Sequence, residues 1–330
     1  MLLFGKICVI MDKKKSLWAV TQERTFLMHL YSTPKDYDCQ VQKILQKAQI
    51  KKAYNSRIVQ YFESIGDFQR AQKIADCGSF IGITRQDERP KIVKANFCRD
   101  RLCNICAWRR QSKFVAQMSP VLQLLSKDFE FLFVTLTAPN VSPAELETSL
   151  TLLLRAFSKL TKRRPIARAF CGICRSLEIT YNAESGTFHP HIHLLVAVRR
   201  SYFTESNLYI SQKELADIWR ECLGLSFTPV VDIRKVSDVG GVELEVLKYA
   251  FKTPKDVAVF GVLSSALRGR RLVSFTGVFA QLRKKLKLSS FEDNLLDDYT
   301  PQGHKICYEL YKFDVTGGVY SFYERLEYEV

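Results

Sequence analysis

Hydrophobic and polar residues alternate along this chain with two periods, one typical of strands and one typical of helices. Phe131–Thr137 is a mostly apolar run that ends before Ala-Pro-Asn, and Val230–Lys235 is a second short strand candidate. Apolar residues three and four positions apart predict helices over Pro143–Leu160, Gln212–Leu223 and about Val242–Phe251. With the strands pairing antiparallel, this order predicts an α+β sheet domain whose helices pack on one face.

Two further strand candidates predict a β-hairpin near the middle of the chain. Residues 176–181 and 187–198 are rich in apolar and β-branched residues, and Asn-Ala-Glu-Ser-Gly between them has turn chemistry. Pairing across that turn places Glu178 directly opposite His191 on one face of the hairpin. A bulge at Pro190 would shift this register.

The second strand of the hairpin carries the chain's most informative motif, His-Pro-His-Ile-His. Because side chains alternate along a strand, His191 and His193 point the same way, about 7 Å apart. Three of the chain's five histidines fall in this motif, so chance is a poor explanation. Two imidazoles beside the Glu178 carboxylate predict a Mg²⁺ or Mn²⁺ site rather than a structural zinc site. His189 is an alternative third ligand.

A second candidate metal site lies upstream, where four cysteines have metal-ligand spacing. Cys98, Cys103 and Cys106 form a C-x4-C-x2-C pattern, and Cys77, followed by a glycine, is the natural fourth ligand. Cys-x2-Cys turns bring two thiolates toward one tetrahedral centre, so the pattern predicts a structural Zn²⁺. Cys171 and Cys174 lack a second pair, and we interpret them as core-packing residues.

Basic residues surround the cysteine pattern. A turn stabilised by zinc and followed by a basic helix could bind phosphates through its basic side chains, so the basic residues here are predicted to contact DNA. They are Arg99, Arg101, Arg109, Arg110 and Lys113.

The chain is predicted to divide into four segments. Residues 1–69 include a helix from Tyr37 to about Phe62, 70–118 hold the Cys-rich zinc-binding module, and 119–290 hold the sheet domain. The remaining segment, 291–330, is acidic, and its two strand-like runs could pack as extra strands. Screening of the basic body and recruitment of a partner are the other roles considered for it.

The charge is unevenly distributed. The net charge is +15, but residues 291–330 hold nine acids against three bases, so the rest of the chain carries +21. Such an excess predicts a polyanionic partner, most simply nucleic acid. No convincing export signal or membrane-spanning run is found. The ten cysteines do not resemble a secreted disulfide framework, because four of them have metal-ligand spacing. We therefore expect a cytoplasmic protein.

The predicted helix over 242–252 has one face of reactive side chains. Glu245, Tyr249 and Lys252 lie four and three residues apart, so they share that face. A tyrosine hydroxyl has an ordinary pKa of about 10 and becomes a nucleophile only where a cation or metal stabilises its phenolate. Lys252 and the histidine-bound metal could do so at a phosphodiester.

Taken in order, these motifs resemble the rolling-circle replication initiators of small bacterial plasmids, a branch of the HUH endonucleases. The motifs are Phe-Cys-Arg-Asp-Arg-Leu-Cys-Asn-Ile-Cys-Ala-Trp-Arg-Arg (97–110), Phe-Val-Thr-Leu-Thr-Ala-Pro-Asn (133–140), His-Pro-His-Ile-His-Leu-Leu (189–195) and Leu-Lys-Tyr-Ala-Phe-Lys (247–252). Leu-Arg-Gly-Arg-Arg-Leu (267–272) also resembles the family's pattern. Asn104 is a departure, since family members usually have proline there.

The resemblance implies an enzyme that nicks a plasmid double-strand origin with a divalent metal and a tyrosine nucleophile. His191 and His193 match the metal-binding pair, Tyr249 matches the nicking tyrosine, and Lys252 matches the lysine of the same motif. Glu245 matches a glutamate thought to activate the terminating water. Implied partners are origin DNA, single-stranded or extruded at the nick, and a host helicase and DNA polymerase.

Other functions stay open on sequence alone. A relaxase or single-strand transposase of the same superfamily would share these motifs. A non-catalytic, zinc-containing DNA-binding regulator would use the histidines structurally and form no covalent adduct.

Overall fold

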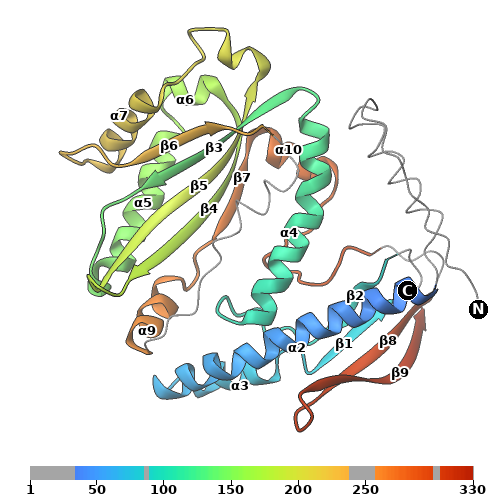
Figure 1. Cartoon of the computed structure of the whole chain (residues 1–330). Coiled ribbons are helices and arrows are strands. Elements are labelled where there is room, and N and C mark those ends of the chain that lie inside the picture. The colour runs from blue at the N-terminus through green and yellow to red at the C-terminus, as the bar shows by residue number, and fades with distance from the viewer. Residues whose placement is uncertain (1–33, 85–88, 238–256, 300–304, 330) are drawn as a thin grey trace, which may run out of the picture.

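The computed structural model describes residues 34–84, 89–237, 257–299 and 305–329 (Figure 1). Its helices are α2 (Pro34–Ser64), α3 (Phe68–Asp76), α4 (Asn104–Leu125), α5 (Leu146–Leu160), α6 (Arg164–Ala169), α7 (Gln212–Leu223), α9 (Val257–Ala266) and α10 (Gly277–Lys285), with short 3₁₀ turns η1 (Pro143–Glu145) and η2 (Arg200–Phe203). Its strands are β1 (Phe80–Thr84), β2 (Lys91–Ala95), β3 (Phe129–Thr137), β4 (Phe170–Asn182), β5 (Thr187–Arg199), β6 (Val231–Lys235), β7 (Val273–Thr276), β8 (Lys305–Asp314) and β9 (Val319–Glu329).

The larger sheet has five strands in the order β6-β3-β5-β4-β7, and neighbouring strands are antiparallel. The predicted hairpin register is confirmed, because Glu178 pairs with His191 and Ile179 with Pro190. The irregularity in this pair lies between Phe170 and Gly172, far from the histidines. The hairpin therefore presents its polar side chains in the predicted register.

Helices cover both faces of the larger sheet, so the expectation of one covered face was wrong. Leu132, Val134 and Ile192 belong to the core under α5, α6 and α7. Phe133 and Leu195, on the opposite face, belong to the core under α4 and α10. The reason is visible in β5, where every residue from Pro190 to Val198 is buried, as expected of a strand enclosed on both sides.

A second, four-stranded sheet has the order β2-β1-β8-β9, with antiparallel neighbours. It shares a hydrophobic core with α2, α3 and the four cysteines. The acidic C-terminal segment thus packs as extra strands, which was one of the roles considered for it. Ile81 of β1 pairs with Tyr311 of β8. This core joins residues from all four predicted segments.

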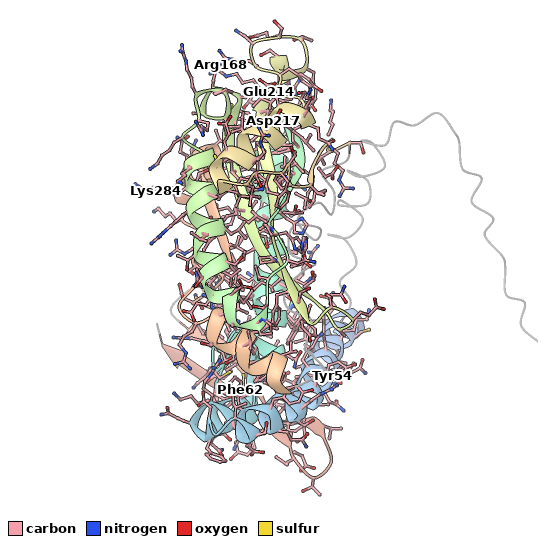
Figure 2. All side chains as sticks on the ribbon, turned by 90° about the vertical axis from the view of Figure 1, so that its left-hand side faces the viewer. Tyr54, Phe62, Arg168, Glu214, Asp217 and Lys284 are labelled. Carbon is pink, nitrogen blue, oxygen red and sulfur yellow. The ribbon has the colours of Figure 1, made fainter. Side chains whose placement is uncertain are left out.

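The two sheets lie at opposite ends of the molecule and are connected by α4 and α9. Figure 2 shows Arg168, Glu214 and Asp217 at the end of the larger sheet, and Tyr54 and Phe62 at the end formed by α2 and α3. Helix α9 joins the two cores: its Phe260 ring lies 4.8 Å from that of Phe62, while Leu263 packs in the core of the larger sheet.

Several predicted elements are confirmed. The helix over Gln212–Leu223 has the expected bounds, the predicted helix from Tyr37 extends over Pro34–Ser64, and the one over Pro143–Leu160 begins as a 3₁₀ turn. The predicted helix over 242–251 lies outside the described residues. None of the helices in the described ranges is long and apolar enough to cross a bilayer.

Candidate functional site

Glu178, His191 and His193 meet on one face of the larger sheet. Nε2 of His191 and Nε2 of His193 each lie 2.6 Å from Oε2 of Glu178, and all three side chains are buried. Strand pairing explains the arrangement, because β4 places Glu178 beside His191 and β5 places His193 two residues further along the same face. The sequence-predicted ligands are therefore brought together, with Glu178 as the third member.

The two ring nitrogens of His191 face different partners. Its Nδ1 lies 3.1 Å from the carbonyl oxygen of His189, and a carbonyl can only accept, so Nδ1 carries the proton. In the neutral ring, the Nε2 lone pair then faces the carboxylate oxygen of Glu178. Two lone pairs at that distance repel unless Nε2 is protonated or both atoms bind the same metal ion. A histidine that binds a metal through one ring nitrogen usually donates a hydrogen bond from the other nitrogen, which fixes the orientation of the ring.

His193 is oriented by the neighbouring strand. Its Nδ1 lies 3.1 Å from the hydroxyl of Thr135, which is its pairing partner on β3. Beyond this pair the same face becomes apolar, with Phe133 and Leu195 under α4 and α10. The group of three therefore borders a packed core, which fixes the positions of its side chains.

Burial raises the pKa of the Glu178 carboxyl, but the contacts with His191 and His193 lower it by a larger amount. The net pKa lies below the ordinary value, so the group is a carboxylate at neutral pH. An ionised carboxylate beside two imidazoles is a donor set suited to a divalent ion.

The alternative ligand, His189, lies beside this group but is not part of it. Its Nδ1 is 2.7 Å from Oδ1 of Asn140, and its ring centroid is 5.2 Å from that of His191. Burial and the neighbouring His191 lower its pKa. In this geometry Glu178, and not His189, completes the group with His191 and His193.

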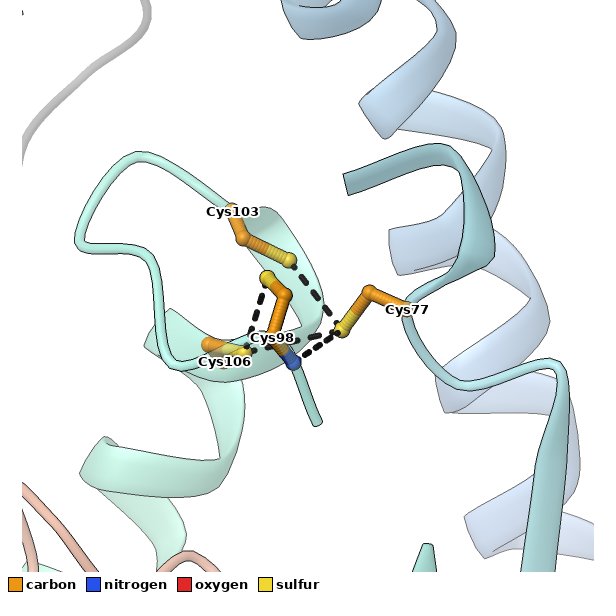
Figure 3. Close-up of side chains that lie close together, drawn as sticks. All are labelled: Cys77, Cys98, Cys103 and Cys106. Carbon is orange, nitrogen blue, oxygen red and sulfur yellow. Dashed lines mark hydrogen bonds between the residues drawn. The ribbon is translucent and has the colours of Figure 1, made fainter. Parts of the chain in front are cut away.

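Cys77, Cys98, Cys103 and Cys106 form a second cluster, at the end of α3 and the start of α4 (Figure 3). Sulfur atoms of neighbouring members are 3.5–3.6 Å apart. A tetrahedral zinc with Zn–S bonds of about 2.3 Å separates its sulfurs by about 3.8 Å, so the cluster is close to that size. Burial opposes ionisation of Cys103, yet hydrogen bonds from Cys106 and Cys77 hold the pKa of its thiol well below the ordinary value.

Backbone and side-chain amides orient the sulfurs. The amide of Cys98 donates to Sγ of Cys77 at 3.4 Å, and the amide of Arg99 donates to Sγ of Cys106 at 3.3 Å. Arg99 has a φ of 61°, a conformation unusual for a residue other than glycine, which accompanies that contact. Amide donors of this kind stabilise thiolates.

Asn55 of α2 is a contributor that sequence reasoning missed. Its Nδ2 donates to Sγ of Cys103 at 3.2 Å, and its Oδ1 accepts from the amide of Asn104 at 2.8 Å. Proline, which family members usually have at position 104, has no amide hydrogen for this bond. A polar residue on the apolar face of α2 was the available signal, but nothing in the sequence linked it to the cysteines.

Two of the predicted DNA-contacting residues lie in the interior. Arg109 and Lys113 are only 4% and 2% exposed. Their side chains bind Asp297 at 2.6 Å and Asp298 at 3.0 Å. Acids of the C-terminal segment thus neutralise α4, because a buried cation needs a partner. We correct the expectation that these two residues face phosphates.

The remaining predicted contacts lie around the cysteine loop. Arg110 donates to the carbonyls of Arg99, Asp100 and Glu292, so it holds the loop in place. Arg101 lies 3.4 Å from Glu292, and Arg99 is exposed.

Cys171 and Cys174 do not form a metal group with each other among the described residues. Cys174 is fully buried in the core under α4, and burial raises the pKa of its thiol to about 12. The core-packing interpretation is confirmed for Cys174. Glu245, Tyr249 and Lys252 lie outside the described residues.

Comparison with known proteins places the chain in a family. The family described as "Replication protein" matches residues 89–321, well over half of the chain. The chain belongs to this replication protein family. A relative called "Protein rep" from Streptococcus pneumoniae serotype 2 (strain D39 / NCTC 7466) is 34% identical over 257 residues, covering 74% of this chain and 80% of the relative.

Two other relatives called "Protein rep" agree with this assignment. The one from Lactiplantibacillus plantarum is 32% identical over 277 residues, covering 76% of this chain and 87% of the relative. The one from Staphylococcus aureus is 36% identical over 217 residues, covering 64% of this chain and 93% of the relative. No solved structure matches the chain.

We expect the purified protein to contain one zinc ion per chain, and Cys106→Ser to lose it. The substitution removes one of four sulfur ligands from a buried cluster, so the melting temperature falls as well. Elemental analysis and thermal melting measure both effects. Cys171→Ser is the matched control and keeps its zinc. Zinc retained in Cys106→Ser would contradict the four-cysteine site.

We expect Glu178→Ala to weaken Mn²⁺ binding at least about tenfold, because even partners behind the metal ligands contribute 10- to 100-fold in affinity. Electron paramagnetic resonance of free Mn²⁺ during a titration measures the affinity. His189→Ala is the control, and its affinity changes less than about threefold because its ring is engaged with Asn140. An equal loss of Mn²⁺ affinity in both variants would indicate that His189 is also a ligand.

Proposed function

We propose that the protein initiates rolling-circle replication of a plasmid by nicking its double-strand origin. The observation that carries this proposal is the convergence of Glu178, His191 and His193 on one sheet face in a chain of the replication protein family. The family's description supports a replication initiator over a relaxase or a transposase. Two imidazoles and a carboxylate are ligands expected of a metal-dependent phosphodiester enzyme, whereas a DNA-binding regulator has no need of them.

The donor set of these three residues fits Mg²⁺ or Mn²⁺. Bound there, such an ion would polarise the scissile phosphate and stabilise the charge that develops on it. Glu178 supplies the anionic ligand, and the two histidines supply Nε2. Thr135 and the carbonyl of His189 hold the rings in the required orientation.

Tyr249 is the proposed nucleophile. Its hydroxyl oxygen forms a bond to the phosphorus while the bond from phosphorus to the 3′-oxygen breaks. The departing oxygen takes a proton and becomes a free 3′-hydroxyl, and the 5′-phosphate stays attached to the tyrosine. Lys252 is proposed to stabilise the phenolate. These two roles rest on the sequence motif.

Glu245 is proposed to end the cycle by accepting a proton from a water molecule that attacks the phosphotyrosine. No second tyrosine lies in the same motif, which favours a cycle that uses a single tyrosine. The free 3′-hydroxyl would prime a host DNA polymerase, with a host helicase unwinding the duplex ahead of it. The DNA at the nick is proposed to be single-stranded or extruded.

We expect the protein with Mn²⁺ to become covalently attached to one of a set of single-stranded oligonucleotides tiled across the DNA that flanks its gene. Tyr249→Phe and His191→Ala abolish the adduct, because they remove the nucleophile and a metal ligand. Denaturing gel electrophoresis with labels on either side of the nick detects the adduct and its polarity.

Tyr54→Phe is the matched control, since Tyr54 is an exposed tyrosine of α2, at the end of the molecule formed by α2 and α3 (Figure 2). It forms as much adduct as the unmodified protein. An adduct that persists in Tyr249→Phe would exclude Tyr249 as the nucleophile. Binding without any adduct on DNA that contains the origin would favour the regulator.

A further inference from the structure

Two arginine-rich segments far apart in the sequence meet at one cleft. One is the loop Arg99–Arg101 within the cysteine pattern, and the other is the segment Leu267–Leu272 that follows α9. The cleft has a volume of about 220 Å³. Its lining includes Arg70, Arg99, Arg101 and Arg268.

The packing around the cleft fixes the relative positions of the two segments. Helix α9 contacts both hydrophobic cores, so the segment that follows it is held against the cysteine loop. Arg70 of α3 donates to Asp100 at 2.8 Å and to the hydroxyl of Ser264 at 2.6 Å, and thereby ties the loop to α9. Arg70 is therefore a positioning residue.

The cleft has more positive charge than its acids neutralise. Asp100, the acid in its lining, already accepts from Arg70 and from the amide of Leu102. Arg99 and Arg268 are exposed, and no carboxylate of the described residues lies within ion-pair distance of either. Nη1 of Arg101 is buried and has no hydrogen-bond partner among the described residues. This unpaired donor adds to the positive potential beside the cleft.

The same segment reaches the group of Glu178, His191 and His193. The carbonyl of Leu272 accepts from the amide of Leu177 at 2.9 Å, and the next residue, Val273, pairs with Ser176. Leu177 directly precedes Glu178, so the segment reaches the edge of β4 next to that residue. The cleft therefore lies at the side of the sheet where the candidate metal group is.

A mostly apolar hollow connects the two places. Its lining includes Arg101 from the cleft, Ser176 from β4 and Leu272 from the arginine segment. Ser176 pairs with His193 across the strands, so this hollow begins next to the candidate metal group. A chain passing from that group to the cleft would meet apolar surface first and arginines after it, an order suited to bases and phosphates.

We propose that this cleft binds phosphates of the single strand that flanks the scissile phosphate, with Arg99 and Arg268 as the donors. The proposal rests on the proposed nicking function, because that function brings single-stranded DNA to Glu178. Guanidinium groups suit this role, since they stay charged and present paired N–H donors to phosphate oxygens.

The test is the affinity of the whole protein for a labelled oligothymidine, measured by fluorescence anisotropy without added divalent metal over a range of salt concentrations. Arg99→Gln combined with Arg268→Gln is expected to weaken binding at least about tenfold at low salt. The slope of log affinity against log salt concentration should become shallower by about 1.4, because each lost phosphate contact on a single strand removes about 0.7.

The matched control removes two arginines of α6 that are also exposed, at the opposite end of the molecule (Figure 1). Arg164→Gln combined with Arg168→Gln changes the net charge by the same amount and is expected to leave the slope unchanged. Equal zinc content and melting temperature show that both double variants are folded.

An unchanged slope in the cleft variant, or an equal change in both variants, would overturn the proposal. Its failure is distinguishable from failure of the nicking function. If the unmodified protein forms the covalent adduct but the cleft variant binds normally, only the cleft assignment is wrong. If the cleft variant loses affinity but no adduct ever forms, the cleft binds single strands and the nicking function is wrong.

Discussion

The register of the β4–β5 hairpin is the constraint on which the candidate site depends. It sets Glu178 opposite His191, and the strand alternation then adds His193 to the same face. A slip of one residue would send Glu178 to the opposite face. Such a slip is unfavourable because β5 is buried on both faces. The apolar side chains that now pack in one core would have to move into the other core. The register that packs the two cores is therefore also the register that aligns Glu178 with His191 and His193.

The second constraint is the neutralisation of charge between the two ends of the chain. Arg109 and Lys113 of α4 are buried, and they are stabilised by Asp297 and Asp298. The acidic C-terminal segment is thus part of the core structure around the cysteine cluster. Because these acids pair with basic residues of α4, the exposed cations without such partners, such as Arg99 and Arg268, are confined to a smaller part of the surface.

Local patterns predicted the local structure well. The turn chemistry after β4 was sufficient to predict the hairpin register, and cysteine spacing was sufficient to predict the cluster of four. Both depend on residues close in sequence or on a simple period. The assignments of Glu245, Tyr249 and Lys252 stay predictions, because they lie outside the described residues.

Non-local features were not accessible from the sequence. The pairing of β1 with β8 joins Ile81 to Tyr311, and no short-range pattern specifies such a partner. The basic residues after the cysteines resemble a surface patch, and only the position of residues 292–298 shows that two of them are interior. The cleft between Arg99 and Arg268 depends in the same way on how α9 packs between two cores.

The most direct test of the account is whether a metal at Glu178, His191 and His193 contacts the scissile phosphate. Replacing each non-bridging oxygen of that phosphate by sulfur, one stereoisomer at a time, allows nicking rates in Mg²⁺ and Mn²⁺ to be compared. The account predicts that one isomer is nicked at least about tenfold more slowly in Mg²⁺ and is substantially restored by Mn²⁺, which accepts sulfur more readily. Equal sulfur effects in both metals for both isomers would contradict direct contact and, with it, the proposed role of this site.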